Sequence, residues 1–252
     1  MPFLQYFSFL LVSAQIIHRT CKIPGEIAFT FDEGPSMYTG TLLNVLTRLN
    51  AFGAFHIDTD FLSNPVNAAF LYRMAADGHL IGLFLRYNGE TLDQLMETIR
   101  ERSDIVSNIT DREITFLRFQ LPHPPVPVLR ALSNQGYQIT TFNLDSQDYL
   151  HTNATENDIS IFEVYKNTFD LINSGAIGSF ISVQRDSIRS SVYQSRRIFD
   201  YTLQKGYRIV RLDSCIGFPV NDSPINRLES ASGLLEMEIQ FWILILFIIL
   251  LQ

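Results

Sequence analysis

Residues 27–35 carry the most informative pattern in the chain, Ile-Ala-Phe-Thr-Phe-Asp-Glu-Gly-Pro. The apolar run through Phe31 is typical of a strand that is buried on both faces. The run stops at two adjacent carboxylates, Asp32 and Glu33, and the Gly-Pro pair after them predicts a turn. Two carboxylates at the end of a buried strand are candidates for a functional site, although a carboxylate that only holds the turn would fit the same residues.

Strands and helices alternate along the chain from this first strand onward. The expected strands are 26–31, 54–58, 79–84, 114–118, 137–144, 179–183 and 207–212. The expected helices are 40–50, 65–77, 91–107, 126–134, 156–173 and 190–204. Regular alternation predicts an α/β fold with a parallel sheet and helices outside it. An open doubly wound sheet and a barrel fit this pattern about equally well.

Composition limits the possible partners. The chain has 252 residues, which fits one large domain or two small ones, and 46% of them are hydrophobic, enough for a packed core. The formal net charge is -7 and there is no basic run, which argues against binding to nucleic acid or to anionic lipid headgroups. A neutral or cationic partner is electrostatically permitted.

Two cysteines, Cys21 and Cys215, lie just outside the first and last expected strands. In a secreted chain such a pair is most simply one disulfide, which would close nearly the whole domain into a loop. A loop of this length corresponds to about 4–5 kcal/mol of stabilisation by the chain-entropy argument. Two unrelated buried thiols are the alternative.

Both ends of the chain look like processing signals. Residues 3–12 form an apolar run followed by Ser13-Ala14, so 1–14 resembles a signal peptide without its basic region, or else a first buried helix. Residues 241–251 are eleven apolar residues, too few for a membrane-spanning helix of about 20. Small residues and a spacer precede them, which favours a lipid (GPI) anchor signal over a tail anchor or a packed helix. The expected division is 1–14 signal peptide, 21–217 barrel domain, 218–240 linker and 241–252 hydrophobic tail.

Glycosylation is also expected. Asn108 and Asn153 begin Asn-X-Thr sequons that fall in expected loops. A third sequon, at Asn221, is weakened by Pro224.

The stretch around Asp32 resembles the first motif, T-F-D-D-G-P, of the polysaccharide deacetylases, a carbohydrate esterase family (family four) that includes the chitin deacetylases. The resemblance covers roughly residues 21–217 and implies a distorted (β/α) barrel with about seven parallel strands, whose working residues lie at the carboxyl ends of strands. In that family the first Asp is the catalytic base, and the second Asp with two downstream histidines holds a divalent metal such as zinc or cobalt. Here Asp32 keeps the base position and Glu33 replaces the second Asp.

The second family motif has lost its metal ligands. The lead-in 78–82, Gly-His-Leu-Ile-Gly, matches well, but Phe84 and Asn88 occupy the two histidine positions. Phenylalanine cannot ligate a metal, and asparagine is a poor ligand for zinc or cobalt. His79 is not a ligand position of the family, and we interpret it as a strand histidine that packs locally.

The remaining motifs are mixed. Arg118 is kept, but Leu121 stands where the family has a tyrosine whose backbone amide helps to bind the oxyanion. Asp145 keeps the position of an aspartate that pairs with the family's arginine and histidine, and we expect it to form a structural ion pair with Arg118. Arg185 replaces the histidine that acts as the general acid. A guanidinium stays protonated to above about pH 12 and cannot deliver a proton, so we expect Arg185 to neutralise Asp32 or Glu33 instead.

We therefore expect a secreted, lipid-anchored, disulfide-closed barrel, monomeric and without a cofactor, that has lost metal-dependent N-deacetylation. Its expected place is the cell surface or cell wall, with chitin or a related polysaccharide as partner and a carbohydrate-binding or structural role. One alternative is a working chitin deacetylase in which Asp32 is the base while Glu33 and Asn88 hold a metal weakly. Another is a protein-interaction module on a wall or host surface.

Overall fold

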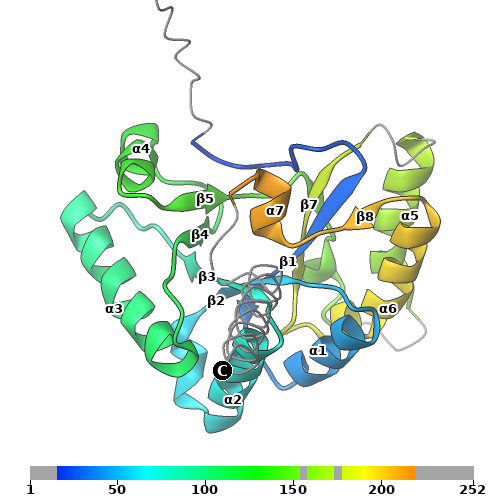
Figure 1. Cartoon of the computed structure of the whole chain (residues 1–252), viewed down its shortest axis with the longest axis horizontal. Coiled ribbons are helices and arrows are strands. Elements are labelled where there is room, and N and C mark those ends of the chain that lie inside the picture. The colour runs from blue at the N-terminus through cyan, green and yellow to red at the C-terminus, as the bar shows by residue number, and fades with distance from the viewer. Residues whose placement is uncertain (1–15, 154–157, 173–177, 219–252) are drawn as a thin grey trace, which may run out of the picture.

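The computed structural model describes residues 16–153, 158–172 and 178–218 (Figure 1). The strands are β1 (Glu26–Gly34), β2 (Ala54–Ile57), β3 (Leu80–Leu85), β4 (Phe116–Phe119), β5 (Gln138–Thr140), β6 (Leu144–Asp145), β7 (Phe180–Arg185) and β8 (Arg208–Ile209). The helices are α1 (Thr39–Arg48), α2 (Pro65–Ala76), α3 (Leu92–Thr110), α4 (Val126–Asn134), α5 (Ser160–Ile172), α6 (Arg189–Gln204) and α7 (Leu212–Ile216). Two short 3-10 helices, η1 (Thr59–Ser63) and η2 (Asp148–Leu150), follow β2 and β6.

The strands form one curled sheet in the order β5-β4-β3-β2-β1-β7-β6, and β8 pairs with the start of β1. Every pairing between these strands is parallel. The longer helices lie around the outside of the curled strands in Figure 1. This arrangement is the distorted (β/α) barrel expected from the resemblance.

Strand β1 is central because its residues suit burial on both faces. Successive side chains of a strand point to opposite faces. Phe29 and Phe31 point toward the helices, where Phe29 packs edge-on against Phe199 of α6 at 4.4 Å between ring centroids. Burying side chains of this size contributes roughly 1.5–3 kcal/mol each. The alternate residues, Thr30 and Asp32, share the interior face of the barrel and are buried.

Two expected strands have different forms in the structure. The strand expected over 137–144 is two strands on opposite edges of the sheet, since β5 pairs with β4 and β6 pairs with β7. The chain crosses between them at Asn143, whose side chain bonds the backbone of Ser179 and Ile181. The strand expected over 207–212 shortens to β8, and its last expected residue, Leu212, begins α7 instead.

The expected disulfide is present: Cys21, before β1, is bonded to Cys215 of α7 across a sequence separation of 194 residues. The amide of Lys22 also donates to the carbonyl of Cys215 at 2.8 Å. The segment before the first strand and the helix after the last strand are therefore joined by a covalent bond and a backbone hydrogen bond.

The glycosylation and terminal predictions have mixed outcomes. Asn108 does not lie in a loop, because α3 continues through it to Thr110, but its side chain is exposed. Asn153 is exposed in a turn, whereas the rest of its sequon lies outside the described residues. The expected signal peptide, the anchor tail and nearly all of the linker also lie outside them. None of the helices within the described ranges has the length and hydropathy needed to cross a membrane.

Candidate active site

A hollow of about 220 Å³ lies where the carboxyl ends of the central strands meet. Its lining combines carboxylates, one guanidinium and apolar side chains: Asp32, Glu33, Phe84, Phe119, Gln120, Leu121, Phe142, Asp145, Tyr149 and Arg185. Leu121 and Tyr149 are 56% and 47% exposed, whereas Phe84 and Phe119 are buried. The hollow therefore has an apolar floor and a partly exposed apolar rim. Of the residues predicted from the motifs, Asp32, Glu33, Phe84, Leu121, Asp145 and Arg185 line it, whereas Asn88 and Arg118 do not.

Asp32 is 3% exposed, and both of its carboxylate oxygens accept hydrogen bonds. His56 Nδ1 lies 2.9 Å from Oδ1, and the Arg118 guanidinium donates to Oδ2 at 3.2 Å. Burial alone would raise the pKa of Asp32, but the charge of Arg118 and the hydrogen bond from His56 outweigh burial and lower it. Asp32 is therefore a firmly ionised carboxylate.

His56 reaches Asp32 because β1 and β2 are in register at these two residues. Burial, and then the charge of Arg118, lower the pKa of His56 to about 4, so the ring is neutral at neutral pH. A carboxylate can only accept, so the proton of the ring is on Nδ1. Nε2 then accepts from the Thr140 hydroxyl at 3.2 Å. His56 and Thr140 are part of the site although sequence reasoning missed both.

Arg118 is 1% exposed and bonds groups on two other strands. Besides Asp32, its guanidinium contacts Thr30 Oγ1 at 3.2 Å and Thr140 Oγ1 at 3.4 Å. The ion pair expected between Arg118 and Asp145 is therefore wrong. Arg118 lies inside the barrel at the level of β1, whereas Asp145 turns back on its own loop and accepts from the Gln147 amide at 3.0 Å.

Arg185 is held by two carboxylates. Its Nε donates to Glu33 at 3.2 Å and its Nη1 to Asp148 at 2.7 Å. The second oxygen of Asp148 accepts from the Arg185 backbone amide at 2.6 Å. Burial would lower the pKa of Arg185, but Asp148 and Glu33 raise it above its usual value. The predicted pairing with Glu33 is thus present, and Asp148 is a second partner that the sequence did not reveal.

The positions of the family's metal ligands do not converge. Phe84 lies on the floor of the hollow. Asn88 is exposed in the next loop, where its backbone amide donates to the Glu90 carboxylate at 2.7 Å. Glu33 is already paired with Arg185. Across the ranges that the structure describes, no three His, Cys, Asp or Glu side chains come together as a metal-binding group. This donor set does not fit a divalent metal.

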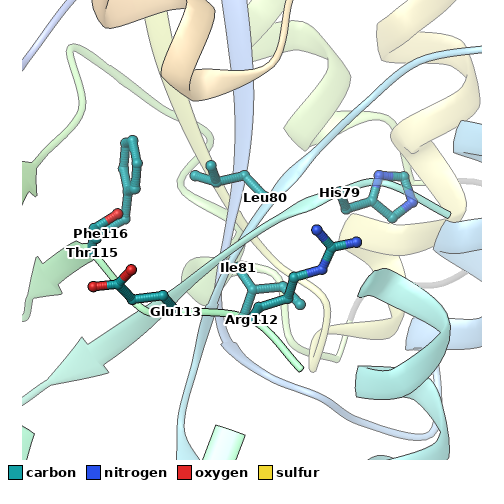
Figure 2. A pocket seen from close by; sticks show the side chains of 7 residues that line it. All are labelled: His79, Leu80, Ile81, Arg112, Glu113, Thr115 and Phe116. Carbon is teal, nitrogen blue, oxygen red and sulfur yellow. The ribbon is translucent and has the colours of Figure 1, made fainter. Parts of the chain in front are cut away.

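A second hollow lies at the other end of the barrel, before β3 and β4 (Figure 2). Its volume is about 20 Å³, which is room for about one water molecule. His79 lines it, accepts from the Gly53 amide at 3.2 Å and packs against the Phe55 ring at 5.3 Å. The prediction that His79 packs locally is confirmed.

Comparison with known proteins defines the class of this chain. Residues 20–140 match the sequence profile of the family described as polysaccharide deacetylase. Residues 20–140 are therefore similar to a polysaccharide deacetylase domain, as the motif around Asp32 indicated.

The most similar proteins include fungal chitin deacetylases. A chitin deacetylase of Arthroderma benhamiae is 27% identical over 79% of this chain, which spans only 54% of that relative's length. One of Colletotrichum lindemuthianum is 27% identical over 82% of this chain and 84% of the relative. The solved structure of a chitin deacetylase from Colletotrichum lindemuthianum has a TM-score of 0.74 at 24% identity, covering 82% of this chain and 94% of that one.

Proposed function

We propose that this protein has lost N-deacetylation and acts as a carbohydrate-associated protein of the cell surface or cell wall. The observation that carries the proposal is the state of Asp32. A general base works best when its pKa lies near the working pH and a lone pair faces the water it deprotonates. His56 and Arg118 engage both oxygens of Asp32 and lower its pKa, so it is a poor base.

The state of Arg185 supports the same conclusion. The reaction needs a donor for the leaving amine, and Arg185 holds its protons more firmly than a free guanidinium does. Its Nε and Nη1 already donate to Glu33 and Asp148. General acid catalysis is typically worth about 10²–10⁴-fold in rate, and activation of water by a metal adds to it.

The hollow supports a binding role. Small-molecule sites are concave and mostly apolar, with a few polar groups that fix orientation. The hollow has this composition, and Tyr149 offers a partly exposed ring on which the apolar face of a sugar can stack. Because the similar proteins are described as chitin deacetylases, chitin or a related polysaccharide is the proposed partner.

The proposed location follows from the ends of the chain and the cysteines. A disulfide suits an oxidising, extracellular compartment, and residues 1–14 and 241–252 have the composition of a signal peptide and a lipid-anchor tail. We propose a secreted, GPI-anchored, glycosylated monomer. Mass spectrometry of the cell-surface form should find neither terminal segment, and finding Trp242 in it would contradict the anchor.

Binding and metal content test the proposed function. Chitin oligomers should shift NMR signals of residues around the hollow, and a Tyr149→Ala variant should weaken binding while an exposed control, Tyr72→Ala, does not. Elemental analysis after exposure to zinc or cobalt should find no stoichiometric metal. One equivalent of metal would favour the alternative, a working deacetylase, and binding to proteins but to no glycan would favour an interaction module.

A further inference from the structure

We propose that the hollow prefers a glycan with free amino groups, that is, the deacetylated polymer, over its N-acetylated form. This inference rests on the proposed function and names the ligand class of the same site. It follows from the charges that surround the hollow and from the polar donors that remain there.

The hollow carries an excess of negative charge. Three carboxylates, Asp32, Glu33 and Asp145, line it with one guanidinium, that of Arg185. Two further charges are buried next to them: Arg118 pairs with Asp32, and Asp148 pairs with Arg185. The neighbouring cation Arg86, 5.1 Å from the Phe84 ring, does not alter this balance because it is paired with Asp58. His56 is uncharged at neutral pH.

An ammonium group finds partners in the hollow. Glu33 is only partly buried, and Asp145 has one hydrogen bond in the described part of the chain, from Gln147 to Oδ1. Both carboxylates line the hollow, whereas the rings of Phe142 and Tyr149 already pack against the guanidiniums of Arg118 and Arg185. A protonated amine is therefore held by charge-assisted hydrogen bonds to the two carboxylates.

An acetamide group finds weaker partners. Its carbonyl oxygen can accept from the Gln120 side chain, which lines the hollow, whereas the Arg185 Nε and Nη1 groups already donate to Glu33 and Asp148. A hydrogen bond between two neutral groups is roughly half as strong as a charge-assisted one. The polar groups of the site thus favour the amine over the amide that replaces it.

Calorimetry with glucosamine and N-acetylglucosamine oligomers of equal length tests the inference. At mildly acidic pH, where the amine is protonated and the carboxylates remain ionised, the glucosamine oligomer should bind at least about tenfold more tightly. The preference should shrink when ionic strength rises from about 0.05 M to about 0.5 M, because salt screens exposed charges.

Matched variants show which carboxylates produce the preference for the glucosamine oligomer. Asp145→Asn and Glu33→Gln should each reduce the preference, whereas Asp104→Asn, which removes the same charge from the exposed face of α3, should leave it unchanged. Equal affinities, tighter binding of the acetylated oligomer, or a preference that survives both variants would overturn this inference and leave the proposed function standing. Binding of neither oligomer would overturn the proposed function itself.

Discussion

Asp32 shows how its surroundings decide whether a carboxylate can act as a base. It stands at the end of β1, where the family places its catalytic base, yet it is bonded on both oxygens from within the barrel. The sequence predicted the position of Asp32 but not its partners, because contacts between strands depend on register. His56 entered this network from a strand that the sequence predicted, and its register with Asp32 became known only from the structure.

The first prediction concerns the partner of Arg118. Asp32→Asn should lower the free energy of unfolding by about 3–5 kcal/mol, since it leaves a buried guanidinium without its counter-charge. Asp145→Asn, the matched change at the position expected from sequence, should cost less than about 0.5 kcal/mol. Urea unfolding measures both variants. A similar loss in the two would show that Arg118 depends on Asp145 after all.

The second prediction concerns pH. His56 has a pKa of about 4 in the folded protein against 6.5 ordinarily, so the unfolded chain binds its proton first and stability falls as pH drops from 6.5 toward 4. His79 acts in the same direction, with a pKa of about 4. Asp186 acts in the opposite direction, because burial raises its pKa to about 7 from 3.8. Burial also lowers the pKa values of His18 and His123 and raises that of Asp148. Four histidines therefore act against two carboxylates, so wild-type stability should rise with pH across this window.

His56→Gln removes one of the four histidines and should make that rise shallower. Thermal unfolding of the variant and the wild type at several pH values between 4 and 6.5 gives the two slopes. Because the substitution also changes stability at every pH, only the difference in slope is informative. Parallel curves would mean that His56 is not a buried neutral histidine in the folded protein.

At the scale of elements, the sequence predicted correctly those helices and strands whose ends are marked by residues within the element itself or next to it. The helix over 126–134 has the predicted bounds, and Asn64 caps α2 as its Asn-Pro pair indicated. The segment 137–144 was misjudged because its apolar residues look continuous while its two halves pair with opposite edges of the sheet. The end of α3 at Thr110 was missed, with 107 predicted instead, because the helix ends on Asp111 in a left-handed conformation. A glycine at that position would have marked the end in the sequence.

The third prediction concerns the disulfide that joins α7 to the segment before β1. Replacing Cys21 and Cys215 together by serine should lower stability by about 5 kcal/mol, because the unfolded chain regains the entropy of a 194-residue loop. Chemical unfolding of the double variant measures the loss, and peptide mapping without reductant checks that the wild-type bond is present. Two free thiols in the secreted wild-type protein would refute the pairing.

At the scale of the whole molecule, the barrel and the site have separate requirements. The core depends on apolar residues that face the helices, and these suit a polysaccharide deacetylase fold throughout. The reaction depends on a few polar positions at the carboxyl ends of strands. By the resemblance, Phe84, Asn88 and Arg185 stand at positions that the family uses for the metal and the general acid, and the proposed loss of the reaction rests in part on these motif positions. The presence of the hollow, its excess of negative charge and its aromatic rim became known only from the structure.

The most direct test of this conclusion is acetate release from acetylated chitin oligomers by the purified wild-type protein, with zinc or cobalt added in excess. Because Asp32 is fully bonded and Arg185 cannot donate a proton, release should be indistinguishable from that in buffer. Release above buffer that Asp32→Asn abolishes, while Asp104→Asn does not, would contradict the loss of the reaction and show that this site still deacetylates.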